Sequence, residues 1–343
     1  MMTIIGKKCS STKMNNRIKS IDFVRAVAIV IIFLSHYFLY GHIPQMESFG
    51  QFLAGTFNVV FFCVSAFLFG MSWNSNGHKP IPILSFLSKR VLRLASSYWP
   101  WLLVVFCCFW MLDESFTLKN VIMNFAFLSW FDKMPGVGHF WFVTMIMICY
   151  VSFVIITHVR MPSLLSGGGK FLLLMIAVLI QYLMDLRGLP GFMITILLIT
   201  DIVFIDAPHV YSIVNNSKYS AFVLTITIIL SVTTIILLYN DYYVSHRTTS
   251  YLLMNASGIM WFLLLMKLGN RTKLNALIVY ISTISYEIYL VHHPLNTGPW
   301  NVYHLTHHPL IAFVLVTVGT YMIAAPLHKV GNFIYKKLKS NKI

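Results

Sequence analysis

Three ionisable residues lie within the first long apolar stretch of the chain, at residues 21–40. They are Asp22, Arg25 and His36, and ionisable groups inside such stretches are costly enough to be functional candidates. Arg25 and His36 are eleven residues apart, so on a helix they share one face and are separated by about 16 Å. This predicts a cationic contact at one end and a proton-accepting imidazole at the other. A structural interpretation also fits, with Arg25 reaching lipid phosphates and His36 hydrogen-bonding a neighbouring helix.

A basic segment, SKRVLR at residues 88–93, places Arg90 and Arg93 three positions apart. Guanidinium groups bind phosphate oxygens through paired hydrogen bonds, so the segment predicts a phosphate clamp. The same residues also suit simple anchoring at the cytoplasmic side of a membrane.

A polar stripe follows the apolar segment at residues 281–295. Ser285, Tyr289 and His292 recur at i, i+4 and i+7, which places them on one face of a helix. Glu287 adds an acid within the same segment. The stripe predicts a polar surface that faces other helices, ending in an imidazole.

The sequence GHFWFV, at residues 138–143, brings His139 and Trp141 to the start of another apolar segment. We expect both at the same depth as His36, where they would line the site. Trp141 alone also suits the aromatic belt at a membrane interface. The five cysteines show no paired metal-ligand spacing, so we expect no metal site.

The amino-acid composition indicates whether the helices that carry these residues lie in water or in lipid. Of the 343 residues, 58% are hydrophobic and 10% are charged, and the mean hydropathy is +0.76. Soluble domains carry about 25% charged residues, so this chain is predicted to be an all-α, polytopic integral membrane bundle. About ten apolar stretches are long enough to be spans; they are centred on residues 20–40, 52–72, 94–112, 140–158, 170–185, 191–206, 219–239, 250–268, 275–293 and 308–328.

Lysine and arginine set the orientation. With the N-terminus inside, twenty of the 25 fall in inner segments and four in outer ones, a strong positive-inside bias that puts both termini in the cytoplasm. We divide the chain into a basic N-terminal segment (1–19), a transmembrane domain (20–328) and a basic tail (329–343). Because the net charge of +15 lies in short clusters between apolar stretches, it does not indicate nucleic-acid binding.

These motifs, in this order, resemble the acyltransferase-3 family of membrane-bound O-acyltransferases, and the resemblance covers nearly the whole chain. The family's FF-x-x-S-G-F-L segment has Ala66 in place of its glycine. The matching residues are Asp22, Arg25, His36, Phe61, Phe62, Ser65, Phe67, Leu68, Arg90, Arg93, Trp141, Phe142, Ser285, Tyr286, Tyr289, Leu290, His292 and Pro294.

The resemblance implies an O-acetyltransferase that uses acetyl-CoA, or another acyl-CoA, as its donor substrate, with no tightly bound cofactor. The donor would come from the cytoplasm, and its phosphates would meet the clamp formed by Arg25, Arg90 and Arg93. His36 would act as general base on an acceptor hydroxyl, or a residue would be transiently acylated.

Further roles follow from the same resemblance. Asp22 would pair with Arg25 or orient it, and we place it with His36, Tyr289 and His292 among the catalytic residues. Candidate donors to the oxyanion are Tyr289, His292 and Trp141. The lining of the site, including the acceptor side, would be formed by His139, Trp141, Ser285 and Glu287.

The implied acceptor is a sugar hydroxyl of a surface polysaccharide or of its lipid-linked precursor, and the implied location is the bacterial cytoplasmic (inner) membrane. The alternative is a polytopic transporter or exporter of a glycan or glycan intermediate, because intramembrane charge fits both. The sequence leaves the oligomeric state open.

Overall fold

The computed structural model describes residues 18–40, 43–112, 115–134, 136–158, 175–176, 178–183, 186, 203–240, 247–298, 300–306 and 308–340. All regular secondary structure in these residues is helical, which confirms the predicted all-α class. Seven of the described helices are long and apolar enough to cross a membrane. The count of ten spans and the orientation of the termini remain predictions.

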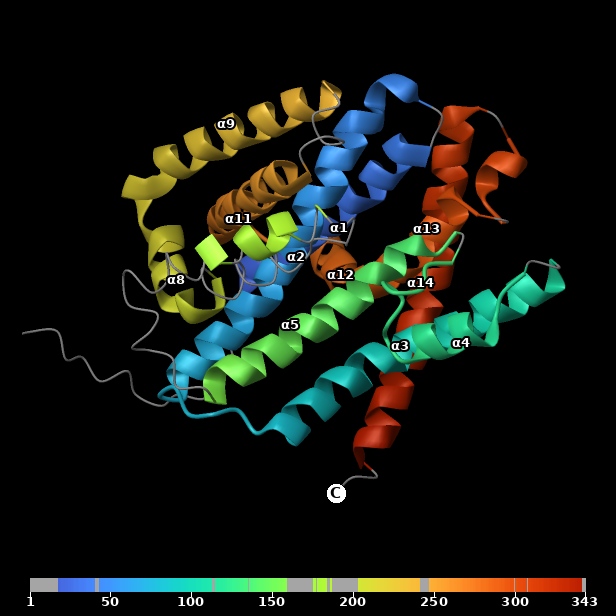
Figure 1. The fold of residues 1–343 in the computed structure, drawn as a ribbon, viewed down its shortest axis with the longest axis horizontal. Coiled ribbons are helices and arrows are strands. Elements are labelled where there is room, and N and C mark those ends of the chain that lie inside the picture. Colours follow the sequence, from blue (N-terminus) through green and yellow to red (C-terminus); the bar gives the residue numbers. More distant parts are fainter. Residues whose placement is uncertain are drawn as a thin grey trace, which may run out of the picture.

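The helices form one bundle (Figure 1). Its long helices are α1 (Lys19–Tyr40), α2 (Glu47–Ser75), α3 (Ile83–Met111), α5 (Trp141–His158), α9 (Ser220–Tyr239), α11 (Arg247–Arg271) and α14 (Pro309–Ser340). The shorter ones are α4 (Leu118–Phe125), α8 (Ala207–Asn215), α12 (Ala276–Thr283) and α13 (Ser285–Asn296). Single 3₁₀ turns lie at η1 (Pro44–Met46), η2 (Gly138–Phe140), η4 (Ser217–Tyr219) and η5 (Val302–His304).

The structure describes only part of some predicted segments, and one helix continues across a predicted boundary. The stretches centred on 170–185 and 191–206 lie largely outside the described residues, as do residues 1–17 of the N-terminal segment. The predicted tail at 329–343 begins inside α14, which continues to Ser340. At 32 residues α14 is about 48 Å long, well beyond the roughly 30 Å of hydrocarbon. Lysine is a good helix former, so the basic sequence does not end the helix.

The span predicted at 275–293 is divided into α12 and α13 by a turn at Ile284. Hydroxyl groups on both sides of the turn bond to backbone carbonyls. Thr283 Oγ1 donates to the carbonyl of Val279 at 2.7 Å, and Ser285 Oγ donates to that of Ser282 at 2.9 Å. Such local bonds compete with the helical backbone pattern and bend helices, which explains the break.

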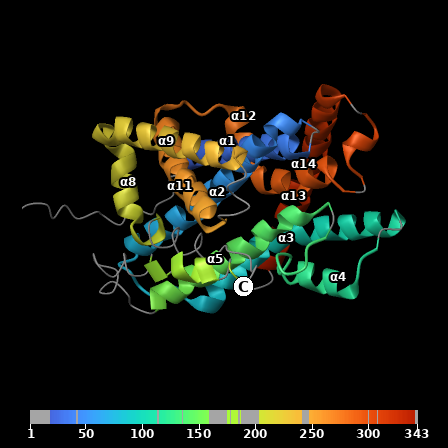
Figure 2. The same ribbon diagram turned by 45° about the horizontal axis from the view of Figure 1, so that its top comes forward.

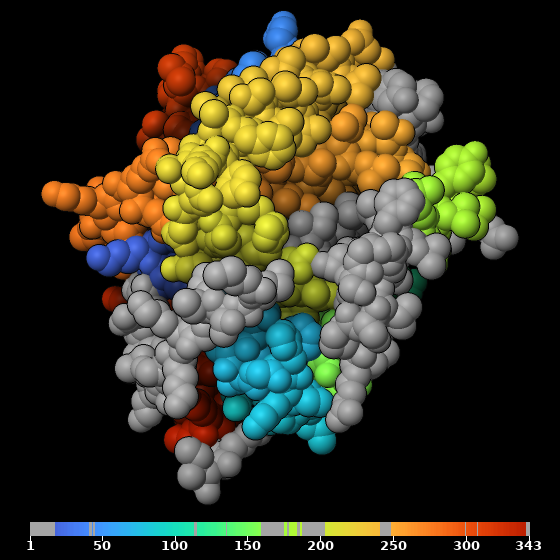
Figure 3. All heavy atoms as spheres, turned by 90° about the vertical axis from the view of Figure 1, so that its left-hand side faces the viewer, coloured from blue at the N-terminus to red at the C-terminus, as the bar shows by residue number. Residues whose placement is uncertain are grey.

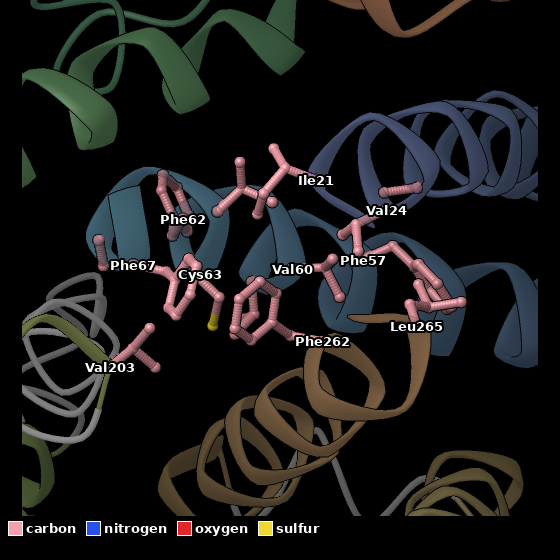
Figure 4. Close-up of a cluster of buried hydrophobic side chains, with 14 of the residues drawn as sticks. Ile21, Val24, Phe57, Val60, Phe62, Cys63, Phe67, Val203, Phe262 and Leu265 are labelled. Carbon is pink, nitrogen blue, oxygen red and sulfur yellow. The ribbon is translucent and has the colours of Figure 1, made fainter. Parts of the chain in front are cut away.

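The apolar core is centred on α2, which packs against α1, α5, α8, α9 and α11. Phe57, Cys63 and Phe67 of α2 point towards α11 and its Phe262 (Figure 4); the rings of Phe67 and Phe262 lie 5.8 Å apart. A glycine permits the close approach. A Cβ at Gly258 of α11 would lie 2.7 Å from the carbonyl oxygen of Thr56. Small residues of this kind let membrane helices pack closely.

The upper part of one face of the bundle is formed by α8 and α9, drawn in yellow and gold in Figure 3. Along α9, large apolar side chains are exposed at Phe222, Ile228, Ile229, Val232 and Ile236. A water-facing surface would not carry such a row, whereas lipid solvates it well. This face is therefore suited to contact with the hydrocarbon of a bilayer.

The polar residues singled out in the sequence lie mainly on α1 and α13. These two helices pack against each other, and α13 also packs against α3 and α14 (Figure 2). The helices that hold the site thus come from the beginning, the first third and the end of the chain.

Candidate active site

An arginine-lined cavity of about 250 Å³ opens between α1, α2, α3, α5 and α13. Arg25 of α1 and both Arg90 and Arg93 of α3 line it. Glu287 also lines it, so three cationic groups and one acid face the same space. Its remaining walls are mainly aromatic and aliphatic: Phe61, Val64, Leu68, Phe69, Leu94, Phe142, Ile146, Tyr150, Tyr286 and Tyr289. An apolar channel with clustered guanidinium groups suits a long ligand that carries phosphates.

Arg25 is half-buried and anchored to the polar stripe of α13. Its Nη2 atom donates to Ser285 Oγ at 3.2 Å. Asp22, one turn earlier on α1, accepts from Ser282 Oγ at 2.9 Å, and both of these residues are buried. The turn between α12 and α13 therefore presents two serine hydroxyls to α1, one for the acid and one for the arginine. These bonds hold the guanidinium at the cavity wall.

The two arginines of α3 are held by aromatic rings. The guanidinium of Arg90 lies 4.1 Å from the centroid of Phe69, and its Nε atom is buried without a hydrogen-bond partner among the described residues. Arg93 is exposed and lies 5.3 Å from the centroid of Tyr335. Arginine stacks well on aromatic faces and keeps its edge free for anions. Because Arg93 is exposed while Arg25 is half-buried, Arg93 lies nearer the solvent end of the cavity.

A chain of polar contacts links Arg93 to the buried acid. Arg93 Nη1 donates to Asn332 Oδ1 at 2.8 Å, and Asn332 Nδ2 lies 2.7 Å from His328 Nε2. Since the amide oxygen is taken by Arg93, the amide nitrogen donates and Nε2 must carry the lone pair. His328 Nδ1 lies 3.2 Å from Glu287 Oε2, close enough for electrostatic contact but not aligned for a hydrogen bond. Ser97 donates to the other carboxylate oxygen at 2.7 Å.

Tyr289 connects the arginine-lined cavity to a cluster of imidazoles. Its ring lines the cavity and lies 5.7 Å from that of His292 and 5.4 Å from that of His139. Its hydroxyl donates to the carbonyl of His139 at 2.8 Å. This bond fixes the position of the ring and occupies the hydroxyl proton.

Four buried histidines form the histidine cluster: His36 of α1, His139 of η2, and His292 and His293 of α13. His292 Nδ1 lies 2.9 Å from the carbonyl of Ile288, which only accepts, so Nδ1 carries the proton and Nε2 is bare. That bare Nε2 lies 2.9 Å from His36 Nδ1. His36 Nδ1 also lies 3.0 Å from the carbonyl oxygen of Ile32, four residues earlier. The Nδ1 proton of His36 therefore faces two acceptors, and its own Nε2 carries a free electron pair.

The other two imidazoles are fixed by backbone carbonyls in the same way. His139 Nε2 donates to the carbonyl of Leu290 at 3.1 Å, and His293 Nδ1 donates to that of Gly136 at 2.9 Å. Their rings are stacked with centroids 4.4 Å apart. Four charged imidazoles at these distances would repel one another strongly in a buried site, so the arrangement favours neutral rings.

Comparison with known proteins identifies the chain. A family model described as an acyltransferase domain matches residues 18–329. The chain belongs to the acyltransferase-3 family. No curated protein and no solved structure matches it. With seven apolar helices among the residues that the structure describes, this acyltransferase-3 protein is a multi-pass membrane acyltransferase.

The structure of this acyltransferase brings most of the predicted site residues together. Arg25, Arg90, Arg93, Glu287, Ser285 and Tyr289 line one cavity, and His36, His139 and His292 form the adjoining cluster. Two residues lie elsewhere. Trp141 packs beside Trp130 and Phe142. Asp22 is fourteen residues from His36 on one helix, about 21 Å along the axis, so it lies at the arginine end.

Sequence reasoning did not assign roles to His293, His328 and Asn332. His293 follows His292 directly and stacks on His139. A signal for the other two was present, because His328 and Asn332 are polar residues four apart in α14 and so share a face. Arg93, the partner of Asn332, is 239 positions away, and no sequence pattern indicates that contact.

Proposed function

We propose that the protein transfers an acyl group, acetyl in the simplest case, from acyl-CoA to a hydroxyl of a sugar acceptor. The acceptor would belong to a surface polysaccharide or its lipid-linked precursor, and the enzyme would reside in a bacterial inner membrane. One observation carries the proposal: a cavity with three guanidinium groups adjoins, through Tyr289, the histidine cluster in which His36 Nε2 is unprotonated. Family membership supplies the reaction class.

The donor fits the cavity by charge and by length. Acyl-CoA carries phosphates at one end and a thioester at the other. Exposed Arg93 and the stacked Arg90 would bind phosphate oxygens at the mouth, and Arg25 would bind further in. A cavity of about 250 Å³ is small for the whole molecule, so the nucleotide would remain at the mouth. The pantetheine arm would lie along the aromatic wall and bring the thioester to Tyr289.

Transfer would begin with removal of the acceptor proton. His36 Nε2 takes the proton from the acceptor hydroxyl, and the oxygen forms a bond to the thioester carbonyl carbon. The carbon–sulfur bond then breaks, and the leaving thiolate takes that proton from the imidazolium. While His36 is charged, its Nδ1–H bond to His292 Nε2 becomes charge-assisted and stronger. His292 would thus stabilise and orient the base without touching the substrate.

Two of the three donors expected for the oxyanion are already engaged, and the third, Trp141, packs beside Trp130 and Phe142. The Tyr289 hydroxyl bonds the carbonyl of His139, and the Nδ1 proton of His292 bonds that of Ile288. We therefore assign no oxyanion donor. The proposed direction places the arginine-lined mouth in the cytoplasm, as the distribution of lysine and arginine predicts.

The decisive variant is His36→Ala, with His158→Ala as its matched control. His158 also bonds the carbonyl four residues earlier, at 3.0 Å, but is exposed at the end of α5. Loss of a general base lowers rates by about 10²–10⁴-fold. We expect that loss in His36→Ala, measured as O-acetyl groups on surface polysaccharide and as CoA released by purified enzyme. His158→Ala should remain within about twofold of wild type.

Both variants are checked for insertion into the membrane and for CoA binding. Normal acetylation by correctly inserted His36→Ala would overturn the role of His36. If glycan export failed while acetylation stayed intact, the transporter would replace the acyltransferase as the physiological function.

A further inference from the structure

A second cavity, of about 370 Å³, opens at the C-terminal ends of α1 and α13. Tyr40, the last residue of α1, and Asn296, the last of α13, contribute to its wall. Arg25 and Ser285, near the other ends of these helices, line the arginine-lined cavity. Because the histidine cluster occupies the intervening turns, the two cavities lie on opposite sides of it.

The wall of the second cavity is rich in hydrogen-bond acceptors. Asn296 is only 2% exposed; its Nδ2 donates to the carbonyl of His292 at 3.0 Å, and its Oδ1 has no partner among the described residues. Asn301 is arranged in the same way, with Nδ2 donating to the carbonyl of Gly298 at 2.8 Å and Oδ1 unpartnered in the described part of the chain. Glu47 adds a carboxylate. Buried acceptors without donors are costly, so a ligand that supplies donors fits this wall.

Charge separates this cavity from the first one. Among the described residues no lysine or arginine side chain lines it, and its one ionised group is acidic. A phosphate-bearing donor would be repelled here. The remaining walls include the aromatic rings of Phe38, Tyr40 and Tyr303. The C–H faces of a pyranose pack on such rings while its hydroxyls point to the surrounding acceptors.

We propose that the second cavity binds the acceptor as a neutral hexopyranoside unit, whose hydroxyls donate to the amide oxygens of Asn296 and Asn301. This inference rests on the proposed function, and it assigns the acceptor a site distinct from the donor's. Asn296 and His292 belong to one helical turn, and the ring of Tyr40 lies parallel to that of His36 with centroids 6.0 Å apart. A sugar in this cavity is therefore one turn from the base.

Saturation-transfer NMR tests the proposal on the full-length protein in lipid nanodiscs. The ligands are the methyl α-glycosides of glucose, galactose and N-acetylglucosamine. We expect saturation transfer to at least one of them, and a decrease of about fivefold or more in both Asn296→Leu and Asn301→Leu. The matched control, Asn270→Leu, removes an amide that bonds Asn215 at 3.0 Å on the surface and should leave the signal unchanged.

CoA binding, measured on the same samples, reports on folding and on the donor site. All three variants should retain it. Absence of transfer to every glycoside with the wild type, or a signal in both cavity variants that equals the wild-type signal, would overturn the acceptor site. The proposed function is refuted by a different result: wild-type protein that binds no CoA, or that releases no CoA from acyl-CoA in the presence of acceptor.

Discussion

Replacing Asn332 with leucine should weaken donor binding although Asn332 does not line the arginine-lined cavity. Asn332 holds Arg93 through a single bond of 2.8 Å between Nη1 and Oδ1. Leucine has a similar volume and keeps the packing of α14 against α3, but it cannot accept that bond. The guanidinium would then sample several orientations before it meets a phosphate.

The magnitude follows from the exposure of Arg93. A hydrogen bond to a charged group contributes about 1.5–3 kcal/mol when buried, but solvent screens an exposed guanidinium and reduces that value. Ordering one long side chain costs about 0.5–1.5 kcal/mol. We therefore expect donor affinity to fall by about 0.5–1.5 kcal/mol, which is about 2- to 12-fold in Kd.

The assay is CoA binding to purified protein by isothermal titration calorimetry, arranged as a double-mutant cycle with Arg93→Ala. Asn332 also bonds His328; we expect its effect on the donor to run through Arg93, so Asn332→Leu should cause no further loss in the Arg93→Ala background. Asn270→Leu is the control for an asparagine lost elsewhere. An unchanged Kd in Asn332→Leu, or an equal loss with and without Arg93, would refute the reasoning.

Two further predictions concern stability, measured as the midpoint of thermal unfolding in detergent. Gly258→Ala should destabilise the protein by about 1–3 kcal/mol, because its Cβ would meet the backbone of Thr56. In the control Gly55→Ala, the new Cβ meets only the flexible end of Met254, so the cost should be under about 1 kcal/mol. Equal unfolding midpoints for the two variants would contradict this reasoning. Lys267→Met should also cost about 1–3 kcal/mol, because buried Lys267 Nζ donates to the carbonyls of Val214 at 3.3 Å and Asn216 at 2.8 Å at the end of α8. Exposed Lys273→Met serves as its control, and a midpoint no lower than that control's would show that the contact is dispensable.

The sequence predicted those parts of the site that depend on periodicity along one helix. Arg25 and His36 share a face of α1, and Ser285, Tyr289 and His292 share a face of α13, because an α-helix returns to the same side every seven or eleven residues. Composition and apolar length were enough to predict a helical membrane protein.

Contacts between helices were beyond sequence reasoning. Lipid-facing and protein-facing surfaces are equally apolar, so nothing in one sequence shows that α3 packs against α14 or brings Arg93 to Asn332. The same limit applies to Trp141, whose position near an interface did not reveal that it packs beside Trp130. The turn at Ile284 was also not foreseen, because serine and threonine bend helices only in some contexts.

The spacing of Arg25 and His36 along α1 has a consequence for substrate choice. A single rigid helix carries both the group proposed to hold the donor and the group proposed to act on it, so their separation of about 16 Å cannot adapt to the ligand. The helix thus fixes the distance from the bound phosphates to the base. A donor arm of one length places its reactive carbonyl at the imidazole, while a much longer acyl group would have to find room beyond the ring. Inserting one residue between them would turn His36 by about 100° and take it out of register with His292.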